Sequence, residues 1–195
     1  MLLAPFGFGA TVGQLSLMQR RTMAITSSAS SLPIAITMGD PAGVGPEILA
    51  RTLLDGGKDG DGDARGKKTA TEHIRWILVG ARWALDKGAA TLSRALPPLH
   101  HIAAPDEAIP GWNLLDLGIP EPDDFRLGHV QSACGELAVK AVEWAATRCL
   151  HGELAAMVTA PINKEAIHAA GYVNDIGHQE ILARLAGVSQ TATML

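Results

Sequence analysis

The strongest constraint on the fold is the alternation of short, continuous apolar runs with segments of helical periodicity. We interpret five apolar runs as buried strands, at residues 33–38, 73–80, 99–103, 112–117 and 154–160. Runs of this kind are typical of parallel strands, which are covered on both faces. The alternation therefore predicts an α/β fold with a largely parallel sheet.

Helical periodicity fills most of the segments between these runs. One helix is predicted to begin at Pro46, with Ile48, Leu49, Leu53 and Leu54 facing inward. The longest predicted helix has Ser132 as its N-cap, ends at Gly152, and carries an apolar face of Leu137, Ala138, Ala141, Val142, Ala145, Cys149 and Leu150. Shorter helices are predicted from Arg82 and over residues 164–170 and 179–186.

The two ends of the chain depart from this pattern. Residues 1–32 are predicted to form a disordered extension, because they are Gly-rich and then Ser-rich. Arg20 and Arg21 follow the apolar stretch, whereas a secretory signal places its charges first; an organelle transit peptide is the alternative. Residues 191–195 begin like a further strand, so we expect residues 33–195 to be the amino-terminal part of a longer unit, incomplete at its carboxyl end.

Composition argues against several classes of partner. The formal net charge is -4 and aromatic residues make up 4% of the chain, which argues against nucleic-acid binding. No apolar stretch approaches the roughly 20 residues of a membrane span. Cys134 and Cys149 would lie roughly 22 Å apart on one helix, too far for a disulfide. We therefore expect two buried free thiols and a cytoplasmic location.

Polar residues follow the strands at 33–38 and 154–160, where ligands bind in open α/β sheets. Asp40 lies in a glycine-containing turn that matches neither a dinucleotide nor a Walker motif; it could orient a substrate or cap the turn. Asn163 could bind a hydroxyl group or cap the following helix. Lys164 near that helix start is unfavourable for the helix dipole, which suggests an anionic partner, although a solvated lysine is equally consistent.

A third polar segment covers residues 175–180 and contains Gly177, His178 and Gln179. His178 is predicted at a helix entrance, where a structural role competes with binding of a hydroxyl or phosphate group. Its neighbours Asp175 and Gln179 are compatible with the binding role. No pair of histidines or carboxylates has metal-ligand spacing on one helix, so we expect no metal site formed by this chain alone.

Together and in order, these segments resemble the 4-hydroxythreonine-4-phosphate dehydrogenase family of pyridoxal phosphate (vitamin B6) biosynthesis. The resemblance rests on ITMGDPAGVGPEI at residues 36–48, VTAPINKEAIHAAG at 158–171 and GHQEILARLAG at 177–187, with support from GHVQSACGELAVKAVEWA at 128–145. It implies a three-layer α/β/α sandwich like that of isocitrate and isopropylmalate dehydrogenases. It also implies a homodimer whose site lies in an interdomain cleft and is completed by the partner subunit.

The resemblance further implies the reaction. Family members oxidise the 3-hydroxyl of 4-phosphooxy-L-threonine with NAD or NADP, and the 2-amino-3-oxo acid then loses carbon dioxide to give 3-amino-2-oxopropyl phosphate. A divalent metal such as Zn, Mg or Co lowers the pKa of the reacting hydroxyl and stabilises the enolate that forms.

Carried over by position, the family's substrate-binding pair falls on His178 and Gln179, with Gln179 in place of threonine. The family's three metal-binding histidines would lie beyond Leu195, so we expect residues 1–195 alone to be inactive. Gln179 also leaves open a related enzyme for D-threonate or D-erythronate 4-phosphate, or for a cis-dihydrodiol dicarboxylate. A non-catalytic fragment is the remaining alternative.

Overall fold

The computed structural model describes residues 32–55 and 73–192. Its five strands are β1 (Ile34–Thr37), β2 (Arg75–Gly80), β3 (His100–His101), β4 (Gly111–Asp116) and β5 (Ala156–Thr159). They form one sheet in the order β3-β4-β2-β1-β5, and every neighbouring pair is parallel. The prediction of an α/β fold with a parallel sheet is confirmed.

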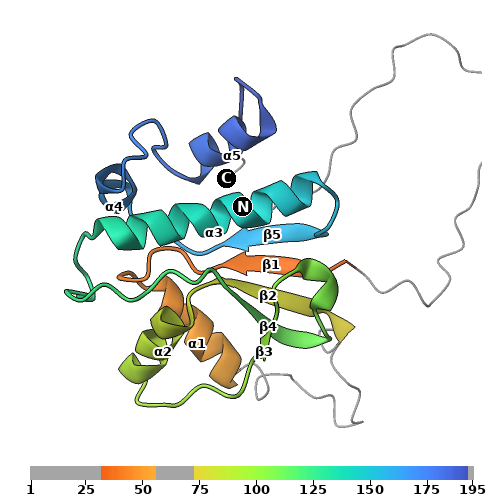
Figure 1. Cartoon of the computed structure of the whole chain (residues 1–195), viewed down its shortest axis with the longest axis vertical. Helices are drawn as coiled ribbons and strands as arrows, with labels where there is room; N and C mark the ends of the chain where they lie inside the picture. The colour runs from red at the N-terminus through yellow and green to blue at the C-terminus, as the bar shows by residue number, and fades with distance from the viewer. Residues whose placement is uncertain (1–31, 56–72, 193–195) are drawn as a thin grey trace, which may run out of the picture.

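Helices cover both faces of this sheet. The helices are α1 (Gly45–Asp55), α2 (Arg82–Thr91), α3 (Ser132–Leu150), α4 (Lys164–Ala169) and α5 (His178–Ala186), with a short 3-10 turn at Pro105–Glu107. Figure 1 shows α1 and α2 on one face and α3 on the other, with α4 and α5 lying against the outer side of α3. The three layers expected from the family resemblance are therefore present.

Successive side chains along each strand point to opposite faces of the sheet, and they contribute to one hydrophobic core on each face. On one side of the sheet, Leu78 and Leu114 are adjacent in register and fully buried beneath α1 and α2. On the other side, Ile77, Val79 and Val142 are fully buried in the cluster that includes α3. Burying a side chain of this size contributes about 1.5–3 kcal/mol, so these two clusters dominate the stability of the layered arrangement.

Some sequence predictions about orientation and helix ends were wrong. Ile48 is 48% exposed, because α1 buries the adjacent stripe that contains Leu49 and Leu53. Leu150 is 54% exposed, because Cys149 is the last buried position before α3 ends. Ser132 is the first helical residue, and the N-cap residue is Gln131, which makes no side-chain cap bond.

Other sequence predictions concern short or undescribed segments. The strand predicted at residues 99–103 is only the two-residue β3, because the chain turns into Pro105–Glu107 soon afterwards. Residues 191 and 192 have no regular structure, and residues 193–195 lie outside the described part, as do residues 1–31 of the predicted disordered extension.

Gly135 in α3 sets the position of α4. A Cβ atom at this residue would lie 2.1 Å from the carbonyl oxygen of Ala166 and 2.6 Å from the amide nitrogen of Ile167. Both are backbone atoms, which cannot rotate away as a flexible side chain can. The absence of a side chain at Gly135 therefore allows α4 to pack directly on the first turns of α3.

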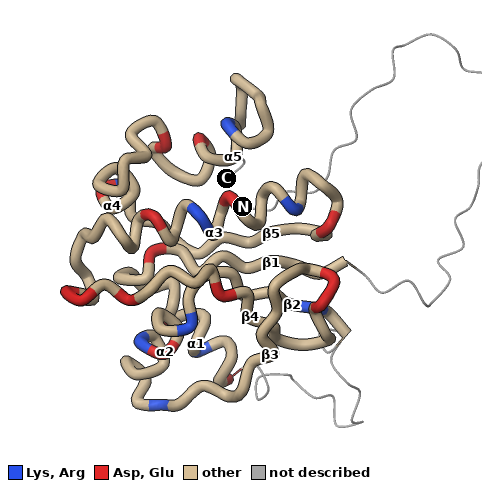
Figure 2. The backbone as a smooth tube through the Cα atoms, viewed as in Figure 1, with Lys and Arg blue, Asp and Glu red and all other residues tan. Residues whose placement is uncertain are grey.

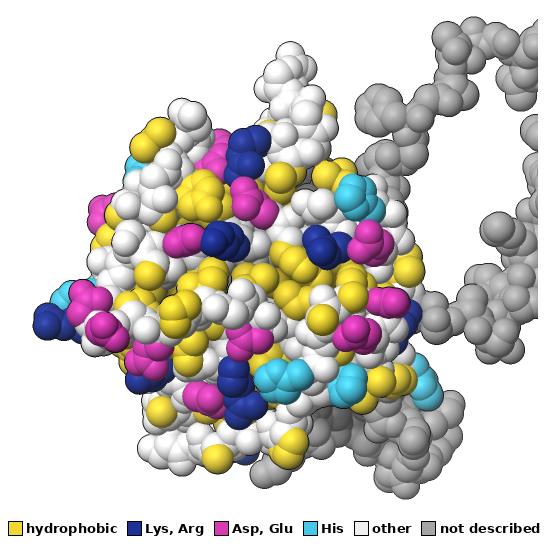
Figure 3. Space-filling model, viewed as in Figure 1, with side chains coloured by type: hydrophobic (Ala, Val, Ile, Leu, Met, Phe, Trp, Pro, Cys, Tyr) yellow, Lys and Arg dark blue, Asp and Glu magenta, His cyan; other side chains and the backbone are white. Residues whose placement is uncertain are grey.

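Charges of both signs are mixed along the described part of the chain (Figure 2), and both cysteines are free. Basic and acidic residues are interspersed along the described backbone, and the face shown in Figure 3 mixes both charges with scattered apolar side chains (Figures 2 and 3). Within residues 32–55 and 73–192, no helix combines the length and the apolar character needed to cross a bilayer. Cys134 and Cys149 are free and buried, as predicted.

Candidate functional site

The candidate site lies where β1 and β5 end side by side. These two strands are neighbours in the sheet. The chain leaves β1 for α1 on one face, and it leaves β5 for α4, which packs against α3 on the other face (Figure 1). The two loops thus diverge, and this is the arrangement at which open α/β sheets form a ligand crevice.

Backbone contacts hold the two diverging loops together at their bases. The N–H of Ala160 donates to the carbonyl oxygen of Thr37 at 3.0 Å, and the N–H of Asp40 donates to that of Pro161 at 2.9 Å. Gly39 makes this approach possible: its φ is +73°, and a Cβ atom there would lie 2.2 Å from the Pro161 oxygen. Only glycine combines this backbone conformation with the required space.

Asp40 closes the turn after β1. Its carboxylate Oδ1 accepts the N–H of Ala42 at 2.8 Å, and the residue is only 4% exposed. Burial raises the pKa of the carboxyl group, and the hydrogen bond from Ala42 partly opposes this rise. Asp40 therefore caps its turn, which was one of the two roles the sequence left open, and also lines the pocket beyond it.

A pocket of about 530 Å³ separates the two loops. It is lined by Asp40, Gly43 and Val44 from the loop after β1, and by residues 161–165 from the loop after β5. The structure therefore brings together three of the residues singled out in the sequence, Asp40, Asn163 and Lys164. A pocket of this size can accommodate a small phosphorylated acid.

Within this pocket, Asn163 and Lys164 differ in what they offer a ligand. The side-chain oxygen of Asn163 accepts the N–H groups of Glu165 at 2.9 Å and Ala166 at 3.2 Å, so it caps α4. Such a cap contributes about 1 kcal/mol. Lys164 is exposed and has no ion-pair partner among the residues that the structure describes. Its ammonium group is the cation available to an anionic ligand.

His178 lies beside this pocket without being one of its lining residues. It is the first residue of α5. Burial lowers the pKa of the ring, and the backbone of Ala160, next to Pro161, partly offsets this effect. The Nε2 atom is buried and has no hydrogen-bond partner in the described part of the chain. His178 is thus a neutral ring with one unused nitrogen at the carboxyl end of β5.

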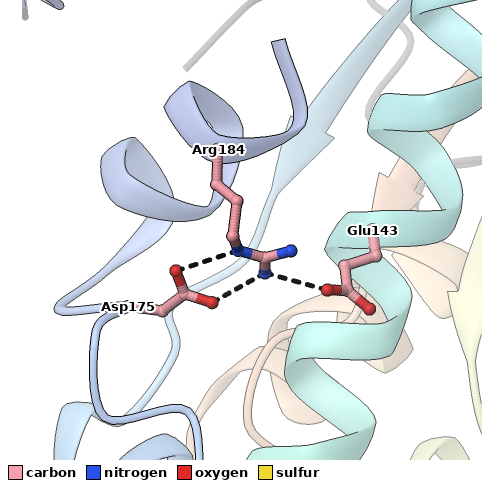
Figure 4. A network of polar contacts seen from close by, with 3 residues as sticks. All are labelled: Glu143, Asp175 and Arg184. Atoms are coloured by element: carbon pink, nitrogen blue, oxygen red, sulfur yellow. Dashed lines mark hydrogen bonds and ion pairs between the residues drawn. The ribbon is translucent and has the colours of Figure 1, made fainter. Parts of the chain in front are cut away.

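Gln179 and Asp175 both have side-chain partners within the described part of the chain. The Gln179 amide donates a hydrogen bond to the hydroxyl of Thr191, so it contacts the segment after α5. The two carboxylate oxygens of Asp175 accept hydrogen bonds from Arg184 at 2.7 and 3.2 Å. Arg184 also donates to Glu143 of α3 at 2.8 Å, as Figure 4 shows. Sequence analysis missed Arg184 and Glu143, because no local pattern links them.

The described residues do not supply a metal site. In residues 32–55 and 73–192, no three His, Cys, Asp or Glu side chains lie close enough together to hold a metal ion. Asp40 is a single carboxylate already bonded to Ala42, and His178 is a single ring. A divalent metal would need at least two further ligands from elsewhere.

Comparison with known proteins relates this arrangement to one family. The family model described as pyridoxal phosphate biosynthetic protein PdxA matches residues 72–195. A D-threonate 4-phosphate dehydrogenase of Pectobacterium atrosepticum is 34% identical over 165 residues, which cover 83% of this chain and 46% of that protein. A 4-hydroxythreonine-4-phosphate dehydrogenase of Geobacter metallireducens is 35% identical over 167 residues, which cover 83% of this chain and 44% of that protein.

Solved structures agree with these matches. The crystal structure of a 4-hydroxythreonine-4-phosphate dehydrogenase from Klebsiella pneumoniae superimposes with a TM-score of 0.66 and 34% identity, over 84% of this chain and 46% of that one. This chain therefore spans a little less than half the length of the relatives it matches.

Proposed function

The chain belongs to the family of the pyridoxal phosphate biosynthetic protein PdxA, and we propose that the protein carrying it is a dehydrogenase of a four-carbon hydroxy acid with a 4-phosphate. The first candidate substrate is 4-phosphooxy-L-threonine, oxidised at its 3-hydroxyl and then decarboxylated to 3-amino-2-oxopropyl phosphate in vitamin B6 biosynthesis. The observation that carries this proposal is the pocket between the loops that follow β1 and β5, which has both Asp40 and the exposed Lys164 in its lining.

Each of these residues has a chemical role in the proposal. The exposed ammonium group of Lys164 would bind a phosphate or carboxylate at the pocket rim. The neutral His178 ring would use its unpartnered Nε2 to accept a hydrogen bond from a substrate hydroxyl, with Gln179 next to it. Asp40 would hold the turn that forms the opposite wall. These residues bind and orient the substrate; none of them is assigned the hydride transfer.

The remaining parts of the reaction come from outside the described residues. We propose NAD or NADP as the hydride acceptor, and Zn, Mg or Co as a divalent metal that would supply Lewis-acid polarisation of the reacting hydroxyl. Because the described residues do not fit a metal, we assign no step to it. We also propose a homodimer in the cytoplasm, in keeping with the family resemblance and with two free, buried thiols.

D-Threonate 4-phosphate is the second candidate substrate. The relative from Pectobacterium atrosepticum carries that name and matches as well as the relatives named for 4-hydroxythreonine 4-phosphate. The two substrates differ at C2, where one has an ammonium group and the other a hydroxyl. Gln179, an amide that can both donate and accept, suits either group.

The test is an assay of the full reading frame with each substrate, each nicotinamide cofactor and each metal. We expect cofactor reduction that requires a metal, and a KM that rises about tenfold or more in Lys164→Gln, as loss of a charge-assisted contact implies. Lys140→Gln is the matched control, because Lys140 is an exposed lysine on α3 paired with Glu136. Turnover of D-threonate 4-phosphate alone would select the second candidate, and absence of turnover with every combination would refute the proposal.

A further inference from the structure

A charged cluster outside the pocket connects α5 to α3. Arg184 of α5 donates Nε and Nη2 to the two oxygens of Asp175, at 3.2 and 2.7 Å, and Nη2 also reaches Glu143 of α3 at 2.8 Å (Figure 4). We name these three residues the α5 clamp. The two-point contact between Arg184 and Asp175 fixes the angle as well as the distance between the groups.

The α5 clamp encloses the segment that carries His178. Asp175 precedes Gly177 and His178, and Arg184 lies in the later turns of the same helix. The N-cap residue of α5 is Gly177, which has no side chain to cap the helix. The first turn of α5 therefore lacks a side-chain N-cap, and the contact between Asp175 and Arg184 ties the loop before the helix to the helix itself.

Burial indicates that this contact is specific. The Asp175 side chain is only 6% exposed, whereas those of Arg184 and Glu143 are 44% and 30% exposed. A carboxylate this buried requires a partner, because an unpaired buried charge is strongly unfavourable. The hydrogen bonds to Asp175 and Glu143 in turn raise the pKa of Arg184, so the guanidinium stays charged.

The first residue of α5 also reaches the candidate site. The His178 ring lies by the backbone of Ala160, which raises its pKa, at the point where β5 gives way to the pocket loop. Ile181, in the next turn, is fully buried in the core cluster that includes α3. A rotation of α5 about this apolar contact would move His178 away from Ala160, and the α5 clamp opposes that rotation.

We propose that Asp175, Arg184 and Glu143 are positioning residues that hold the His178 ring against Ala160 at the substrate pocket. The substrate-binding role of His178 rests on the proposed function. Whether the α5 clamp holds the ring in place can be tested without substrate. A purely structural clamp would stabilise the whole fold equally. A positioning clamp acts on the local opening of α5, so the two roles predict different hydrogen exchange.

The experiment compares hydrogen exchange at two sites of the 195-residue chain by NMR. One site is the ring N–H of His178, identified by its loss in His178→Gln, and the other is the backbone N–H of Val142 in the core of α3. In Arg184→Lys and Asp175→Asn, we expect the His178 ring N–H to exchange about tenfold faster or more, as loss of a charge-assisted hydrogen bond implies. The Val142 amide should be unaffected.

Glu136→Gln is the matched control, because it removes a carboxylate of α3 whose ion-pair partner, Lys140, is exposed and lies on the same helix. It should leave both exchange rates unchanged. If Arg184→Lys or Asp175→Asn does not fold, Glu143→Gln replaces them, because it leaves the contact between Arg184 and Asp175 intact. It should increase the exchange rate of the His178 ring N–H and leave that of Val142 unchanged.

Equal acceleration at His178 and Val142, or no acceleration at His178, would overturn the positioning role. The same variants in the full reading frame should raise the KM for the phosphorylated substrate more than they change kcat. A changed exchange rate with an unchanged KM would count against the substrate role of His178, and so against the proposed function rather than the clamp.

Discussion

The close contact between the two site loops predicts a large difference between two glycine substitutions with the same backbone conformation. Gly39 and Gly152 both have a φ of +73°. A Cβ atom at Gly39 would lie 2.2 Å from the carbonyl oxygen of Pro161, whereas one at Gly152 would have nothing within 4 Å. Comparing Gly39→Ala with Gly152→Ala therefore separates the cost of the contact from the cost of the left-handed conformation.

The magnitude follows from three contributions. Alanine in the left-handed region costs about 1–2 kcal/mol at either position. At Gly39, the Pro161 carbonyl must also move by roughly 1 Å or more, an overpacking that costs about 1–3 kcal/mol. That movement weakens the 2.9 Å hydrogen bond from Asp40 to Pro161, which is worth about 1 kcal/mol. We expect Gly39→Ala to lose about 2–4 kcal/mol more unfolding free energy than Gly152→Ala.

Urea denaturation of the two variants and the unmodified chain, followed by circular dichroism, measures this difference. The slope of unfolding free energy against urea should stay the same, because neither variant changes the surface exposed on unfolding. Equal losses in the two variants would show that the loops after β1 and β5 are not in contact, and the pocket between them would then have no structural basis.

Two further predictions concern the α4 cap and the buried thiols. Asn163→Ala should lower the unfolding free energy by about 1 kcal/mol, whereas Asn163→Asp should retain most of it; thermal denaturation of both variants checks this, and equal losses would contradict the capping role. Burial raises the pKa of Cys134 and of Cys149 from 9.0 to about 11. The unfolded chain therefore loses thiol protons first, and stability should fall as pH rises from about 9 to about 11, by about 2–3 kcal/mol per thiol. A variant with alanine at both positions should lose this part of the pH dependence, and an unchanged profile would show that the thiols do not cause it.

The strands and the residues that follow them could be predicted because their signals are local. Apolar runs located β1 and β5, and Asp40 and Lys164 lie within four positions after the ends of these runs. Parallel strands end at one edge, so both residues were expected at that edge. The order of strands in the sheet was not predictable in the same way, because the pairing of β1 with β5 joins segments more than a hundred residues apart in the chain.

The α5 clamp shows a second limit of local patterns. Arg184 meets Asp175 nine positions earlier and Glu143 forty-one positions earlier. Neither spacing matches the three- or four-residue separation at which charges on one helix interact. The sequence therefore shows Asp175 as a polar neighbour of His178. It does not show that Asp175 pairs with Arg184, because that contact depends on how α5 packs against α3.

Asn163 and Lys164 show why residue type alone does not identify a binding group at the end of a strand. Short polar side chains are common there for two reasons: they can contact ligands, and they can cap the helix that follows. In this chain the Asn163 oxygen is used by the N–H groups of Glu165 and Ala166. Lys164, by contrast, is an exposed residue of the pocket lining and has no ion-pair partner in the described part of the chain. An anionic ligand would therefore be bound here by the cation, while the amide keeps the helix in the position that presents it.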